Sequence, residues 1–112
     1  MKKFVLLVLI LITGLTVFSQ GIEFQKGRYA EVLEMAKKQN KLVFIDIYTS
    51  WCGPCKHMAD NVFPQAKVGE YYNAHFLNLK LDAEKSEDGK MVAKTFGVSA
   101  YPTFLFVNGD GE

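Results

Sequence analysis

Two cysteines two residues apart, directly after an apolar run, constrain this chain more than any other feature. Residues 42–48 read LVFIDIY, a β-branched and aromatic run with almost no alternation, which predicts a strand covered on both faces. The next motif is Cys52-Gly53-Pro54-Cys55, and proline is suited to the first turn of a helix. We therefore expect a buried strand, a short loop and a helix that begins at the two thiols.

The short spacing between the cysteines favours redox chemistry over a structural disulfide. A disulfide that closes so small a loop gains little from restraining the unfolded chain. The nucleophile of disulfide exchange is a thiolate, which the positive end of a helix dipole stabilises, so Cys52 is predicted to be the reactive thiol. Cys55, one turn further along, is expected to be more buried and less ionised. Gly53 leaves a partner chain room to approach the sulfur.

The remaining patterns predict an α/β fold with a small central mixed sheet flanked by helices. We expect strands within residues 41–49, 75–81 and 103–107, and helices at 27–40, 56–61, 64–72 and 90–96. Crossover helices make parallel neighbours and cover both faces of a sheet. Residues 108–111 (NGDG) are typical of a turn between antiparallel strands, so we expect a last antiparallel strand after Gly111. The domain is thus predicted to lack its C-terminal strand and helix in this chain.

The first 19 residues have the layout of a secretory signal peptide. Lys2 and Lys3 precede an apolar stretch at residues 4–12, and a more polar exit leads to Ser19. Cleavage after Ser19 would leave one domain, residues 20–112, in a periplasmic or secreted location. The alternative is an uncleaved membrane anchor that extends through residues 4–18. If the signal is cleaved, no stable membrane insertion is expected.

The order of the motifs resembles the thioredoxin superfamily, and the resemblance covers residues 29–112. It rests on Asp46, on residues 51–56 (WCGPCK), on residues 101–103 (YPT) and on the closing NGDG turn. The helix break at residues 61–64 and the turn at residues 82–84 are more similar to exported thioredoxin-like domains. The comparison that fits best is the C-terminal domain of the membrane thiol:disulfide interchange proteins.

The resemblance implies a substrate-binding surface around the cysteines. Pro102, after Tyr101, matches the family's cis-proline, which lies across from the cysteines and offers backbone groups to an extended peptide. The alternative is a trans proline that opens an edge strand. Trp51 would cover the disulfide and form the peptide-binding surface with Gly53 and Pro54, although a tryptophan also serves readily as a packing residue.

Asp46 lies in the middle of the apolar run, where burial should raise its pKa. The resemblance implies that this carboxylate accepts the proton of Cys55. The alternative is an aspartate that points to solvent at a strand edge. The family places a lysine beside this acid, and Asn78 is expected to replace it here. Residues 84–88 are expected to form a solvated loop.

Together these features predict an exported thiol:disulfide oxidoreductase that reduces protein disulfides through its Cys-Gly-Pro-Cys dithiol. The Gly-Pro pair is, by resemblance, that of reducing thioredoxins. Disulfide-containing proteins are the expected substrates, and a membrane electron donor is the inferred partner that recharges the dithiol. No cofactor is required by this chemistry.

Other functions remain open from the sequence. A disulfide oxidase or isomerase would use the same motif, and a non-catalytic module would use the fold to bind a metal or an extended peptide. A zinc site would have to combine Cys52 and Cys55 with His57 and His75, whose spacing is unrelated to known sites, so no metal is expected. The formal net charge of +1 argues against nucleic-acid binding.

Overall fold

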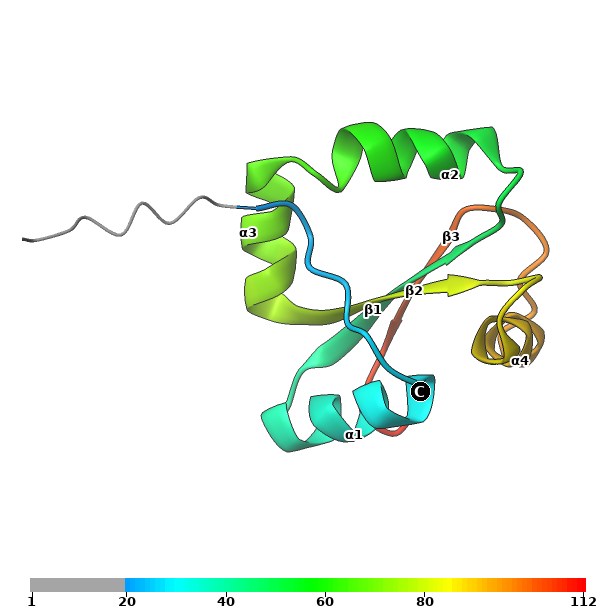
Figure 1. Ribbon diagram of the computed structural model, residues 1–112. Coiled ribbons are helices and arrows are strands. Elements are labelled where there is room, and N and C mark those ends of the chain that lie inside the picture. The colour runs from blue at the N-terminus through cyan, green and yellow to red at the C-terminus, as the bar shows by residue number, and fades with distance from the viewer. Residues whose placement is uncertain (1–19) are drawn as a thin grey trace, which may run out of the picture.

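The computed structural model describes residues 20–112, so the expected signal peptide lies outside the described residues. The described chain forms, in order, α1 (Tyr29–Gln39), β1 (Leu42–Tyr48), α2 (Gly53–His57), the π-helical segment η1 (Met58–Val62), α3 (Ala66–His75), β2 (Phe76–Asp82), α4 (Glu87–Thr95) and β3 (Thr103–Val107) (Figure 1). The predicted order of helices and strands is confirmed. Within this part of the chain, no helix has the length and apolarity needed to cross a membrane.

The three strands form a mixed sheet in the order β2-β1-β3. β1 and β2 are parallel, as expected for strands joined by crossover helices. β3 is antiparallel to β1, so the sheet is mixed, as predicted, although the antiparallel strand was expected only after Gly111. After α4 the chain does not cross back to the end of the sheet where β1 and β2 begin, so β3 begins beside the C-terminal end of β1, with Thr103 opposite Ile47. The loop before β3 therefore lies at the end of the sheet where β1 leads into the cysteines.

β1 is covered on both faces, as its apolar run predicted. Residues 43–47 are each at most 2% exposed. Because side chains alternate along a strand, Val43, Ile45 and Ile47 point to one face, where they pack with residues of α1 and α4. Figure 1 shows α1 and α4 on one side of the sheet and α2 and α3 on the other.

Aromatic rings fill the second face of the sheet. Phe44 lies at the centre, with ring centroids 4.9 Å from Tyr72, 5.3 Å from Phe106, 5.6 Å from Phe104 and 6.2 Å from Phe63. Alternation places Asp46 on this same face. The single charged residue of β1 therefore faces the layer that contains α2.

Pro64 ends the first helical stretch, as the sequence predicted. The π-helical segment η1 ends at Val62, Phe63 N–H donates to the Met58 carbonyl at 2.9 Å, and α3 begins after Gln65. α4 begins at Glu87, three residues earlier than expected. The Ser86 hydroxyl caps it by accepting the Gly89 N–H at 2.8 Å.

Residues 20–25 form a segment that we call the N-terminal strap. It lies along the outer edge of β2, where Phe24 pairs with Asn78 in parallel and Gln25 N–H donates to the Asn78 carbonyl at 2.7 Å. Ile22 N–H donates to the Phe63 carbonyl at 2.8 Å. The strap is the blue segment that passes from α3 toward α1 in Figure 1, and no sequence pattern predicted it.

Candidate active site

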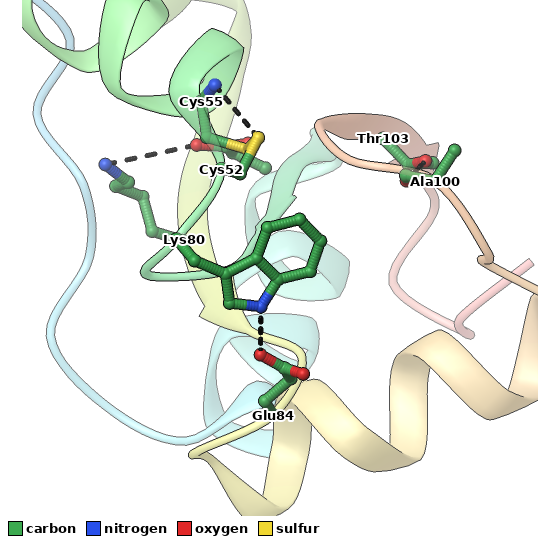
Figure 2. Close-up of a disulfide and its surroundings, with 8 residues drawn as sticks. Cys52, Cys55, Lys80, Glu84, Ala100 and Thr103 are labelled. Atoms are coloured by element: carbon green, nitrogen blue, oxygen red, sulfur yellow. Dashed lines mark hydrogen bonds and ion pairs between the residues drawn. A yellow bond between two sulfur atoms is a disulfide. The ribbon is translucent and has the colours of Figure 1, made fainter.

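Cys52 and Cys55 form a disulfide at the N-terminus of α2 (Figure 2). Cys52 is the N-cap of this helix, and its Sγ accepts the Cys55 N–H at 3.1 Å. The two residues are 6% and 5% exposed, so the expected difference in burial is absent from the disulfide form. Position distinguishes them instead, because the Cys52 sulfur receives the amide that a helix N-terminus offers to a negative charge.

The two residues between the cysteines leave the disulfide open to a partner. Pro54 occupies the first turn of α2, where its missing N–H costs nothing. A Cβ atom added at Gly53 would meet no other atom within 4 Å. Another chain can therefore approach over Gly53.

Trp51 presents a large exposed ring beside the cysteines, with 69% of its surface accessible. Its Nε1–H donates to a Glu84 carboxylate oxygen, and its ring stands edge-on to Tyr101 with centroids 6.1 Å apart. Glu84 lies in an exposed turn, as expected, and its carboxylate additionally holds Trp51. Figure 2 shows Glu84 beneath the site in the loop after β2. The hydrogen bond holds an apolar surface in place next to the disulfide.

The loop before β3 completes the rim of the site. The peptide bond between Tyr101 and Pro102 is cis, and the Thr103 hydroxyl donates to the Ala100 carbonyl at 2.7 Å. Figure 2 shows Ala100 and Thr103 on the same side of the fold as the disulfide. The antiparallel direction of β3 brings Pro102 to this edge, about fifty residues from the cysteines in sequence.

Asp46 is buried beneath the site, only 1% exposed, and not at a solvated strand edge. Burial raises the pKa of Asp46 to about 6, and the nearby Lys80 ammonium lowers it in part. The Lys80 Nζ lies 4.0 Å from Asp46 Oδ2. Within residues 20–112, Asp46 Oδ1 has no hydrogen-bond partner. The carboxylate is therefore costly to ionise and has one cation nearby.

Lys80 is the lysine beside the acid, which corrects the expectation that Asn78 replaces it. The parallel register places Lys80 opposite Asp46 and Asn78 opposite Phe44. The Asn78 side-chain amide donates to the Tyr72 carbonyl at 3.2 Å, away from the carboxylate. Sequence reasoning missed Lys80 because only the strand register decides which residue of β2 faces Asp46.

A cavity of about 200 Å³ connects the sulfur atoms with the lysine. Cys52, Cys55, Lys56 and Lys80 are among its lining residues. In the described part of the chain, no group of three or more histidines, cysteines or acids could hold a metal ion. The His75 ring packs against Tyr71, with centroids 4.3 Å apart. The structure therefore gathers thiols, a buried acid and a lysine in one place.

The fold and this site define a class of protein: an α/β domain with a dithiol–disulfide pair at the N-terminus of the helix that follows its central strand. The family model described as Thioredoxin matches residues 22–112, and the chain belongs to the thioredoxin family.

Relatives and solved structures agree with this assignment. The chain is 39% identical to Thioredoxin H2-1 from Oryza sativa subsp. japonica over 87 residues, which are 78% of this chain and 58% of the rice protein. It is 38% identical to Thioredoxin from Echinococcus granulosus, over 70% of this chain and 68% of that protein. The chain thus spans 58% of the rice relative and, likewise, 58% of Thioredoxin H4 from Arabidopsis thaliana.

A solved structure from Bacteroides thetaiotaomicron is also similar. This protein, proposed to be a disulphide-isomerase, is 47% identical, with a TM-score of 0.72 over 84% of this chain and 77% of the other.

Proposed function

We propose that this domain is an exported thiol:disulfide oxidoreductase that reduces disulfides in other proteins. The observation that carries the proposal is the Cys52–Cys55 disulfide at the N-terminus of α2, beneath an open Gly53 and beside the exposed Trp51. Membership in the thioredoxin family supports it.

The reducing reaction begins from the dithiol. The Cys52 thiolate attacks one sulfur of a substrate disulfide, forms a mixed disulfide and releases the other substrate sulfur as a thiolate. The Cys55 thiol then loses its proton and attacks the Cys52 sulfur. This second step forms the Cys52–Cys55 disulfide and releases the remaining substrate thiolate, so two electrons pass from the dithiol to the substrate.

Asp46 is the proposed acceptor of the Cys55 proton. It lies on the face of β1 toward α2, and a pKa of about 6 keeps it largely ionised at neutral pH, ready to take up a proton. Tyr101 and Pro102, on the loop before β3, are proposed to meet the substrate peptide together with Trp51, Gly53 and Pro54.

Export and the direction of electron flow belong to the same proposal. Residues 1–19 carry the signal-peptide pattern, which supports a periplasmic or secreted location. The Gly-Pro pair between the cysteines supports the reducing direction. A reductase in an oxidising compartment must be reduced again, so a membrane electron donor is the proposed partner.

Disulfide isomerisation is the second candidate, because the Bacteroides thetaiotaomicron protein is proposed to be a disulphide-isomerase. Equilibration with a glutathione buffer separates the two functions. A reductase is expected near the potential of thioredoxin, about −270 mV, whereas protein disulfide isomerase lies near about −180 mV.

The two-cysteine mechanism predicts different behaviour for the two cysteine variants. Cys52→Ser should abolish attack on substrate disulfides, because the thiol at the helix N-terminus is gone. Cys55→Ser should accumulate mixed disulfides on Cys52, because nothing resolves them. The measurement is non-reducing electrophoresis with mass spectrometry of the trapped partners, beside an insulin-reduction assay.

Thr95→Ser provides the matched control, since Thr95 is exposed at the end of α4 and does not line the cavity at the cysteines, so this variant should reduce insulin like the wild type. Equal trapping by the two cysteine variants, or none by either, would contradict the proposed roles.

A further inference from the structure

Lys80 sits in a cage of three aromatic rings beside the buried acid. Its Nζ lies 4.9 Å from the ring centroid of Tyr48, 5.4 Å from that of Phe24 and 5.9 Å from that of Phe63. All three distances are within the range at which a ring face attracts a cation. The rings come from β1, from the strap and from the residue after η1.

Phe24 is the ring of this cage that the N-terminal strap supplies. It is fixed at the edge of β2 by the backbone pairing of the strap with Asn78 and by edge contact with the Phe63 ring, with centroids 5.5 Å apart. Phe24, Phe63 and Lys80 line a cavity of about 390 Å³ next to the strap. The Lys80 side chain is 30% exposed. Without the Phe24 ring, this flexible ammonium could turn away from the acid into water.

We propose that Phe24 is a positioning residue of the redox site: its ring holds the Lys80 ammonium beside the Asp46 carboxylate. The strap thereby belongs to the site, although it contacts neither cysteine. The relevance of Phe24 to catalysis rests on the proposed function, in which Asp46 takes the proton of Cys55. The effect of Phe24 on Asp46 itself does not depend on that function.

Other charged and titratable groups near Lys80 and Asp46 also contribute to the electrostatic environment of the carboxylate. β3 contributes none, because residues 103–107 are uncharged. The groups that share a strand or a cavity with Lys80 are Tyr48 on β1, Asp82 on β2, Cys52, Cys55 and Lys56 around the start of α2, Glu23 on the strap, and Arg28, Glu87 and Asp88 near α4. Of these, Arg28 and Asp88 form an ion pair of their own at 2.9 Å. None of these groups is altered by a change at Phe24.

Phe24→Leu tests the proposal, because leucine keeps an apolar cover and removes the ring. The carboxyl carbon of Asp46, followed by NMR against pH in the oxidised full chain, reports the pKa directly. A carboxylate that loses a held cation becomes harder to ionise, so we expect the pKa of Asp46 to rise by about 0.5. Lys80→Met removes the cation altogether and should give a larger rise. Phe24→Tyr, which restores a ring, should titrate like the wild type.

Phe106→Leu is the matched control. Phe106 packs against Phe44 and Phe76 and lies on β3, on the other side of β1 from Lys80. This variant should leave the Asp46 titration unchanged. If Phe24→Leu also leaves it unchanged while Lys80→Met raises it, the proposal is overturned. A fall in the pKa for Phe24→Leu would overturn it as well, because Phe24 would then be a barrier to water.

A second measurement keeps the test decisive should Phe24→Leu fail to fold. In the wild-type chain, the ε-methylene protons of Lys80 should be shifted upfield by the rings around them, and ordinary shifts would overturn the proposal. The pH profile of mixed-disulfide resolution should follow the Asp46 titration in each variant. If the titration moves and the chain reduces no disulfide, the proposed function fails while the positioning role stands.

Discussion

At the scale of single residues, Asp46 is an acid buried in the interior of the described domain. It is 1% exposed, and the Lys80 Nζ lies 4.0 Å from its Oδ2. Burial raises its pKa from 3.8 to about 6, so ionisation costs more in the folded chain than in the unfolded one. A buried group with a strongly raised pKa is a candidate for a functional role, and proton transfer is the role proposed for Asp46.

Asp46→Asn should therefore stabilise the oxidised domain at neutral pH. Below pH 3.8 the acid is protonated in both states. Between pH 3.8 and about 6 only the unfolded state ionises, so stability falls as pH rises, and above pH 6 the penalty is constant. The shift corresponds to about 3 kcal/mol at pH 7. Urea unfolding at pH 7 and pH 3 should show a gain at pH 7 that vanishes at pH 3.

Asp60→Asn is the control for this substitution, because Asp60 is 58% exposed and pairs with Lys56 across one helical turn. It should change the free energy of unfolding by no more than about 0.5 kcal/mol at either pH. An Asp46→Asn variant that is less stable than the wild type at pH 7 would contradict the account in which the buried Asp46 carboxylate destabilises the folded chain.

At the scale of secondary structure, a residue of α4 caps α1, a helix distant from it in sequence. Arg28, the N-cap residue of α1, makes no capping bond with its own side chain. Asp88, in the first turn of α4, accepts the Tyr29 N–H at 2.9 Å and binds the Arg28 guanidinium with both oxygens. These bonds, chiefly that from Arg28, lower the pKa of Asp88. Asp88 was expected in a solvated loop, and this expectation was wrong.

Asp88→Ala should destabilise the domain by about 1 kcal/mol at pH 7, the usual cost of losing a helix cap. A lowered pKa means that the stabilisation is present above the unfolded pKa and is lost as pH falls through the folded one. Urea unfolding should therefore show a smaller difference from the wild type at pH 2 to 3 than at pH 7. Asp60→Ala, which caps no second helix, should have little effect at either pH.

At the scale of the whole molecule, the site is assembled from segments spread along the described chain. β1 supplies Asp46, α2 the cysteines, β2 the lysine, and the loop before β3 the cis proline. The strap can run close against α3 on its way to the site, because α3 has a glycine at the point of contact. A Cβ atom at Gly69 of α3 would collide with the backbone of Gln20 and Gly21.

Gly69→Ala should consequently displace the strap. Alanine normally stabilises a helix relative to glycine, so a loss of about 1 to 3 kcal/mol in the free energy of unfolding would be diagnostic of the close packing. Amide exchange at Ile22 and Gln25, whose N–H groups bond to Phe63 and Asn78, should accelerate. Gly53→Ala, which adds a Cβ in open space, should leave both amides unchanged. A Gly69→Ala variant with wild-type stability and exchange would contradict this account.

The residue pattern alone was enough to predict the order of the helices and strands, the helix break at Pro64, the buried central strand and the pair of cysteines at a helix start. Each of these depends on propensities and spacings within a few consecutive residues, which are written locally in the chain. Tertiary structure decided the partners: Lys80 rather than Asn78 beside Asp46, Glu84 on Trp51, Asp88 on α1, Phe24 over the lysine, and the antiparallel course of β3. The two hydrogen bonds among these contacts join residues 33 and 59 positions apart, and all of the contacts follow from strand register and packing.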